Sequence, residues 1–171
     1  SKLCQLEIIS SYALRLLILT ATRTKEIIEA KFDEFNLKTR IWTIPAEKMK
    51  VRKEHKIPLS NEAISIVELM RKKHNHTFVF INPSTGKHIS NGAMLVFIKK
   101  QFPNLKITVH GFRATFRDWA EETNKYQHHA IEFCLAHQLP NKVEKAYLRS
   151  DLFEQRKIII GDWEKILLKQ N

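Results

Sequence analysis

The sequence predicts an α+β fold that is mainly α-helical, with a small three-stranded antiparallel sheet near the N-terminus. Over most of the 171 residues, apolar side chains recur every three or four positions, as they do on one face of a helix. Between residues 32 and 59 the period changes to the alternation of half-buried strands. The chain is 43% hydrophobic, and no apolar run is long enough to cross a bilayer. We therefore expect one globular domain, residues 1–171.

An arginine marks the junction of the first two predicted helices. Residues 3–20 are apolar around most of the helix circumference, which predicts a deeply buried helix. The pattern breaks after residue 20 and resumes at Thr24, so Arg23 falls between two helices, where its side chain can reach a cleft. Glu26 follows three residues later and can hold the guanidinium, or a neighbouring imidazole, in a fixed direction.

The three predicted strands cover residues 32–37, 40–45 and 55–59. The connection between the second and third, residues 46–54, is a hairpin rich in basic side chains. A flexible ammonium group on such a tip can swing toward a ligand. The basic residues of this hairpin are Lys48, Lys50, Arg52 and Lys53.

The middle of the chain alternates between helices and short turns. Ser60 and Glu62 open a helix that closes at residues 72–74, where basic side chains favour the helix end. Residues 78–81 are expected to form a short buried strand, and residues 82–87 a turn. Ser90 is expected to cap the helix that ends at residues 99–100.

A helix begins at Gly111, because Phe112, Phe116 and Trp119 recur at helical spacing. His110 and Arg113 stand three residues apart at its first turn, so we expect both side chains to lie on one face. The start of a helix also attracts anions. This arrangement is suited to binding a phosphate.

Three segments follow the central helix. An apolar run at residues 131–135 leads to His137, a short helix at 143–149 carries Tyr147, and a helix at 152–169 has a broad apolar stripe that packs on its own core or on a neighbour. Cys134 and His137 are three apart, so a zinc site that they form with His128 is an alternative. It is not favoured, because no second ligand pair has finger-like spacing.

The charge of the chain points to nucleic acid. Twenty-nine Lys and Arg against eighteen Asp and Glu give a net charge of +11, spread along the whole sequence. The two cysteines, Cys4 and Cys134, are too few for a disulfide framework, which favours the cytosol. No signal peptide precedes the first helix, and the missing initial Met suggests a piece of a longer protein.

Together these residues resemble the catalytic domain of the tyrosine recombinases, and most closely phage and genomic-island integrases. Residues 19–26 (LTATRTKE) match the arginine box of that family, and residues 49–50 with 57–60 match its lysine hairpin. Residues 110–113 (HGFR), 135–137 (LAH) and 146–149 (AYLR) match the central box, the second histidine and the nucleophile. Ala21 and Ala136 stand where the family usually has Gly, which matters little if the backbone there is helical.

The resemblance implies a site-specific recombinase that cleaves and rejoins DNA through a 3′-phosphotyrosyl intermediate, to integrate or excise a phage or genomic island. Two guanidiniums suit the charge of a phosphodiester and of its transition state. A tyrosine with a pKa of about 10 needs a base, for which His110 is the candidate. The implied catalytic residues are Arg23, Lys50 as general acid, His110, Arg113, His137 on a phosphate oxygen and Tyr147 as nucleophile, supported by Glu26.

Some assignments stay open at this stage. Lys48 and Lys53 are alternatives to Lys50 as the general acid, whereas Tyr12 and Tyr126 are interpreted as structural. No metal, cofactor or ATP is implied. Two other functions compete: relaxation of DNA by a type IB topoisomerase-like enzyme, and a catalytically silent DNA-binding module.

The resemblance also implies partners and a location. The partner is double-stranded DNA, bound by a tetramer of the full-length protein, with possible DNA-bending or directionality factors and no membrane. The location is the bacterial cytoplasm, associated with the nucleoid. The core-binding and arm-binding domains that usually precede this domain are not in the sequence.

Overall fold

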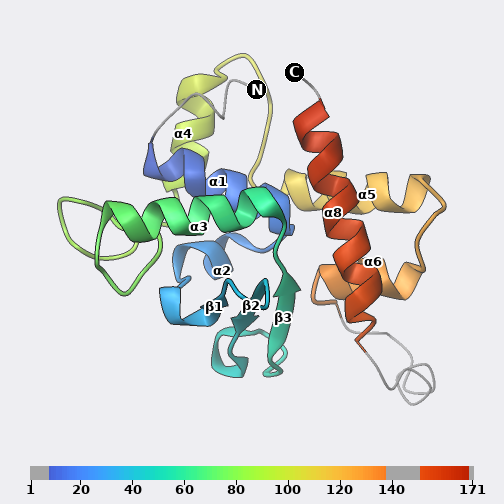
Figure 1. The fold of residues 1–171 in the computed structure, drawn as a ribbon. Coiled ribbons are helices and arrows are strands. Elements are labelled where there is room, and N and C mark those ends of the chain that lie inside the picture. The colour runs from blue at the N-terminus through green and yellow to red at the C-terminus, as the bar shows by residue number, and fades with distance from the viewer. Residues whose placement is uncertain (1–7, 138–150, 170–171) are drawn as a thin grey trace.

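The computed structural model describes residues 8–137 and 151–169. There, the helices lie above and to the right of one small sheet in the view of Figure 1, and the predicted fold class is confirmed. The helices are α1 (Ile9–Thr20), α2 (Thr24–Ile28), α3 (Asn61–Lys73), α4 (Ala93–Gln101), α5 (Gly111–Glu122), α6 (His128–Cys134) and α8 (Phe153–Lys169). The strands are β1 (Phe35–Asn36), β2 (Ile41–Ile44) and β3 (His55–Pro58), with 3₁₀ turns η2 (Phe32–Glu34) and η3 (Ala46–Lys48).

Helix α1 is the central element of the core, as its apolar circumference predicted. From Ser11 to Thr20 every side chain except Arg15 is buried. The helix contacts α2, α3, α4, α5 and α8. Arg15 is only partly buried, and its guanidinium pairs with Glu62 of α3. Trp163 of α8 donates a hydrogen bond to the Ile18 carbonyl at 2.8 Å. These contacts join α1 to both α3 and α8.

The sheet has the order β1-β2-β3, and all pairs are antiparallel, as expected. Trp42 is fully buried and stacks on Phe35 with ring centroids 4.8 Å apart. Strand β1 is shorter than predicted, because residues 32–34 form the turn η2. This turn presents Glu34 to the indole N–H of Trp42 at 3.0 Å and to the ammonium of Lys48.

Two local predictions in the middle of the chain are wrong. Residues 78–81 make only isolated bridges, Lys31 to Phe78 and Ile81 to His88, so no strand forms although Val79 and Phe80 are buried. The run is apolar because it is buried, and buried strands have the same composition, but none of the described strands pairs with it. Ser90 does not cap α4, which begins after Gly92 without a side-chain cap. The cap at Ser60 is confirmed, since its Oγ accepts from the Ala63 N–H at 3.4 Å.

The apolar stripe of α8 packs on the protein's own core. Trp163 meets Phe116 edge-on with centroids 5.6 Å apart and lies 4.9 Å from the Trp119 ring, which joins α8 to α5. Arg156 is 1% exposed and donates to the Lys56 carbonyl and to Asp151, so it joins α8 to β3. Among the described helices, none combines the length and the apolar character that a membrane span needs.

The backbone at Ala21 and Ala136 is not helical, so the condition under which these two departures from the family pattern would matter little is not met. Their φ angles are 50° and 51°, in the left-handed region where a Cβ is strained and Gly is favoured. Ala21 is the residue that ends α1, and Ala136 follows the residue that ends α6. Alanine in place of glycine at these two positions therefore strains the backbone, although α1 and α6 still end there.

We expect Ala136→Gly to raise the free energy of unfolding by about 0.5 to 1 kcal/mol, because relief of left-handed strain exceeds the extra entropy of Gly in the unfolded chain. Ala21→Gly should raise the free energy of unfolding by less, because Ala21 is 2% exposed and the substitution removes the contacts of its buried methyl group. Urea unfolding measures both. Ala130→Gly, inside α6, is the matched control and should destabilise. A loss of stability in Ala136→Gly would contradict the argument.

Candidate functional site

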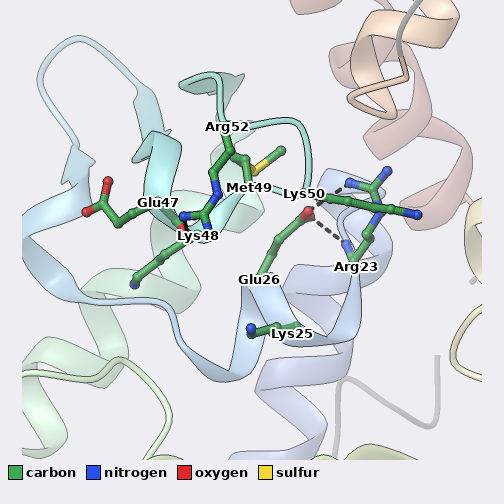
Figure 2. Close-up of a pocket in the computed structure, with 8 residues that line it drawn as sticks. All are labelled: Arg23, Lys25, Glu26, Glu47, Lys48, Met49, Lys50 and Arg52. Carbon is green, nitrogen blue, oxygen red and sulfur yellow. Dashed lines mark hydrogen bonds and ion pairs between the residues drawn. The ribbon is translucent and has the colours of Figure 1, made fainter.

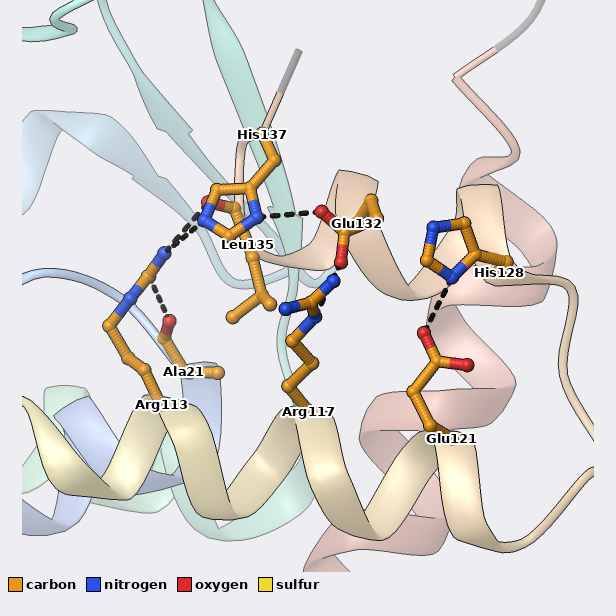
Figure 3. A network of polar contacts seen from close by, with 8 residues as sticks. All are labelled: Ala21, Arg113, Arg117, Glu121, His128, Glu132, Leu135 and His137. Carbon is orange, nitrogen blue, oxygen red and sulfur yellow. Dashed lines mark hydrogen bonds and ion pairs between the residues drawn. The ribbon is translucent and has the colours of Figure 1, made fainter. Parts of the chain in front are cut away.

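Arg113 lies where the ends of two helices converge. Its side chain enters from the first turn of α5 and is 6% exposed. One guanidinium nitrogen, Nη1, donates to the carbonyl of Ala21 at the end of α1, and Nη2 donates to the carbonyl of Leu135 at the end of α6 at 2.9 Å (Figure 3). Helix C-termini carry partial negative charge, so this position suits a cation. The guanidinium is therefore rigidly oriented by main-chain atoms.

His110 does not share the surroundings of Arg113. It directly precedes α5 and is exposed, whereas Arg113 is buried. The N–H of Gly111 is satisfied by the hydroxyl of Thr108 at 3.0 Å, so His110 is not needed as a cap. Within the described residues no hydrogen bond fixes the His110 imidazole. The side chain is free to meet a group that approaches from outside.

Arg23 is held by Glu26, as their three-residue spacing predicted. The Arg23 Nη1 donates to the Glu26 Oε1 at 2.9 Å, and the Arg23 backbone N–H donates to Oε2 at 2.7 Å. Glu26 is 7% exposed, while about a third of the Arg23 side chain remains accessible. The same carboxylate therefore caps α2 and orients the guanidinium.

The two arginines, ninety positions apart in the sequence, lie close enough to repel each other. Burial lowers the pKa of Arg113 to about 10, and the positive charge of Arg23 adds to the effect, against the opposing charges of Glu26 and Glu132. Bringing like charges together in a partly buried place is unfavourable unless an anion joins them. The arrangement is therefore suited to bind an anion between two guanidiniums.

His137 joins this group from the end of α6. Its Nε2 lies 3.5 Å from the Arg113 Nη2, and its Nδ1 lies 2.8 Å from the Glu132 Oε2. The other carboxylate oxygen of Glu132 lies 2.7 Å from the Nε of Arg117. Burial raises the pKa of Glu132, but the hydrogen bond from His137 and the charges of His137 and Arg117 outweigh it and lower that pKa below its usual value. Glu132 is therefore a carboxylate at neutral pH.

The structure distinguishes the lysines of the hairpin. Lys48 is bound, since its Nζ donates to the Glu29 carbonyl at 2.6 Å and to Glu34. Lys50 is exposed and, like Lys48, lines a pocket that Arg23 and Glu26 also line (Figure 2). Lys53 is exposed and is not among the residues that line this pocket. Of the three, Lys50 is placed to meet a ligand of Arg23.

Sequence analysis missed His55, at the start of β3. Burial, followed by the charges of Arg156, Arg23 and Arg113, lowers its pKa to about 3, so its ring is neutral at physiological pH. A signal was present, because strand alternation puts His55 on the same face as Ile57, which is 1% exposed. Glu132 and Arg117 were also missed. Arg117 follows Arg113 by one helical turn and therefore lies on the same face of α5.

We expect His55 to make stability depend on pH. Its pKa falls on folding from 6.5 to about 3, so in this interval the unfolded chain binds a proton that the folded chain does not. The free energy of unfolding should therefore fall as the pH decreases from about 6.5 toward 3, and less in His55→Gln. Urea titrations between pH 7.5 and 4 measure the difference. A difference between the two proteins that stays constant with pH would contradict the prediction.

The alternative zinc site does not assemble. Among the described residues, the donors that gather within 4.8 Å of one another are Glu121, His128 and Glu132, not Cys134 with His137 and His128. Burial raises the pKa of Cys134 to about 11, so it remains a thiol, which binds metals poorly. Glu132 already holds Arg117 and His137.

The predicted nucleophile, Tyr147, lies outside the described residues. The two other tyrosines are bound in the fold. Tyr12 is 5% exposed in the core. The Tyr126 hydroxyl donates to Asp162 at 2.9 Å, and burial together with this bond raises the pKa of Tyr126 to about 12. Neither side chain is suited to attack.

Known integrases are similar to this chain in sequence. The sequence model described as the phage integrase family matches residues 2–152. Prophage integrase IntZ of Escherichia coli K12 is 33% identical over 152 residues, which cover 88% of this chain and 38% of that protein. The integrase of Enterobacteria phage P4 is 25% identical, over 94% of this chain and 40% of its own. The chain thus spans about two fifths of the length of these relatives.

A solved structure shares the fold. The crystal structure of XerA recombinase superimposes with a TM-score of 0.61 at 14% identity, covering 95% of this chain and 56% of that one. At this level of identity the likeness concerns the fold alone.

Proposed function

Since the chain belongs to the phage integrase family, we propose that it is the catalytic part of a site-specific recombinase that cleaves and rejoins DNA to integrate or excise a mobile element. One observation carries the proposal: Arg23 and Arg113 come from distant elements, yet each faces the charge of the other. Such a pair binds the non-bridging oxygens of a phosphodiester and the extra charge of its pentavalent transition state.

The reaction is a transesterification in two balanced halves. The Tyr147 hydroxyl oxygen attacks the phosphorus, the bond to the 5′ oxygen breaks, and a 3′-phosphotyrosyl link forms. His110 accepts the phenol proton, Lys50 gives a proton to the leaving 5′ oxygen, and His137 binds a phosphate oxygen. The energy of the broken bond is retained in the new one, so a 5′ hydroxyl of another DNA end restores the diester without ATP.

The proposal extends to partners of the full-length protein. Double-stranded DNA suits the net charge of +11. Exchange between duplexes requires several protomers, so we propose a tetramer on DNA, with accessory bending or directionality factors, acting at the bacterial nucleoid.

A suicide-substrate experiment tests the function. The chain is incubated with nicked duplexes tiled across the ends of the mobile element, so that the cleaved strand diffuses away and a covalent protein–DNA adduct accumulates. Peptide mass spectrometry should find the nucleotide on Tyr147. Absence of any adduct, with DNA binding retained, would favour a silent binding module. Relaxation of supercoiled DNA without exchange between duplexes would favour topoisomerase-like activity.

We expect Lys50→Ala to lower the rate of adduct formation about a hundredfold, because the leaving oxygen loses its acid. Substrates with sulfur in place of the bridging 5′ oxygen should restore the rate, because a thiolate leaves without a proton. Lys48→Ala is the matched control in the same hairpin. It should leave the rate unchanged and lower stability by about 1 to 3 kcal/mol, since Glu34 loses a partner. Equal rates in the two variants would refute the assignment.

A further inference from the structure

We propose that Glu132, backed by Arg117, is the positioning residue of the site: it accepts the hydrogen bond of His137 Nδ1 and so directs Nε2 to the phosphate, where Nε2 donates to an oxygen once it also carries a proton. This inference rests on the proposed function for the role of His137, but the orientation itself stands on contacts of the described residues. No prediction from sequence had assigned either residue a role.

The contacts determine which ring nitrogen is free. A carboxylate only accepts hydrogen bonds, so the 2.8 Å contact between Glu132 Oε2 and His137 Nδ1 requires a proton on Nδ1. The other nitrogen, Nε2, faces the Nη2 of Arg113 at 3.5 Å. An imidazole without this partner can turn or exchange its proton between the two nitrogens. Glu132 therefore decides that Nε2 is presented beside the guanidinium.

Arg117 prevents Glu132 from turning away. Its Nε lies 2.7 Å from Oε1, the oxygen that His137 does not use, so both ends of the carboxylate are held. Arg117 is also one helical turn beyond Arg113 on α5 (Figure 3). The same helix thus delivers one arginine to the phosphate and a second to the partner of the histidine. Any shift of α5 moves Arg113 and Arg117 together, so the positions of Arg113 and His137 at the phosphate are coupled.

A neighbouring pair provides a matched control. Glu121, one turn beyond Arg117, accepts from His128 at 2.6 Å and likewise joins α5 to α6 (Figure 3). This pair has the same chemistry but contacts neither Arg113 nor His137. A purely structural bridge between α5 and α6 would make Glu121 and Glu132 equally important, whereas positioning of His137 needs Glu132 alone.

The first test is nitrogen-15 NMR of the imidazoles in the DNA-free chain. At a pH at which the imidazole is neutral, His137 should show a protonated Nδ1 and a bare Nε2 in wild type and in Glu132→Gln, whose amide oxygen still accepts. Glu132→Ala should lose this preference, and Glu121→Ala should keep it. An unchanged tautomer in Glu132→Ala would overturn the proposal. This readout needs no activity, so it stands even if the proposed recombinase function fails.

The second test is kinetic. Adduct formation on suicide duplexes should slow about ten- to a hundredfold in Glu132→Ala, through loss of orientation, with DNA affinity within twofold of wild type. Glu132→Gln should recover most of the rate, and Glu121→Ala should react as wild type. Rates are taken per folded molecule, measured by circular dichroism. Loss of affinity and rate together, or equal loss in Glu121→Ala, would show a structural bridge and overturn the proposal.

Discussion

Arg113→Lys should lower the rate of adduct formation about a hundred- to a thousandfold, the usual effect of removing a fixed donor from developing charge. Lys keeps the positive charge but lacks the planar fork that can bind two oxygens at once. It also cannot replace both hydrogen bonds of Arg113, to the carbonyls of Ala21 and Leu135. The ammonium would therefore be less well oriented, and the transition state would lose more than the ground state.

The effect of Arg113→Lys on stability has to be separated from its effect on the reaction rate. Arg156→Lys is the matched control, because Arg156 is also buried and also donates to a carbonyl, that of Lys56, but lies in α8. It should lower the melting temperature and leave the rate per folded molecule close to wild type. If Arg113→Lys reacts at the wild-type rate, or if Arg156→Lys is equally slow, the role of Arg113 in binding the phosphate is refuted.

Tyr147→Phe should form no adduct at all, because the substitution removes only the attacking oxygen. Binding to the same duplexes should persist, since the positive charge of the chain is unchanged. Denaturing gels that separate covalent from reversible complexes measure the first quantity, and gel-shift titration measures the second.

Tyr126→Phe is the control for this experiment. The Tyr126 hydroxyl donates to Asp162, and its pKa of about 12 leaves it protonated, so its removal should not affect the adduct. An adduct in Tyr147→Phe at the wild-type level, lost in Tyr126→Phe, would show that another tyrosine attacks and that the sequence assignment is wrong.

Elements with a strong period were predictable from sequence. The helices α3, α5 and α8 and the order of the sheet follow from apolar spacing, which reports the side of an element that faces the core. The link between Arg23 and Glu26 was predictable because both lie in one turn. The run at residues 78–81 was mistaken for a strand, because complete burial looks alike in strands and in irregular segments.

The sequence could not reveal features that depend on backbone angles or distant partners. Nothing local marks Ala21 and Ala136 as left-handed, since alanine is common in helices. The residues next to Lys48 and Lys50 in the sequence also do not distinguish the two lysines. In the structure, the carboxylate of Glu34 in η2 binds Lys48, whereas Lys50 is exposed.

By itself, the sequence determined the fold class, the boxes that identify the family and the candidates for catalysis, because residue type and spacing carry that information. The tertiary structure alone decided that Arg113 is buried between two helix ends, that Glu132 binds His137 and that burial and the charges of three arginines lower the pKa of His55. The physical reason is range. Period and propensity act over a few residues, whereas burial and charge depend on groups that only folding brings together.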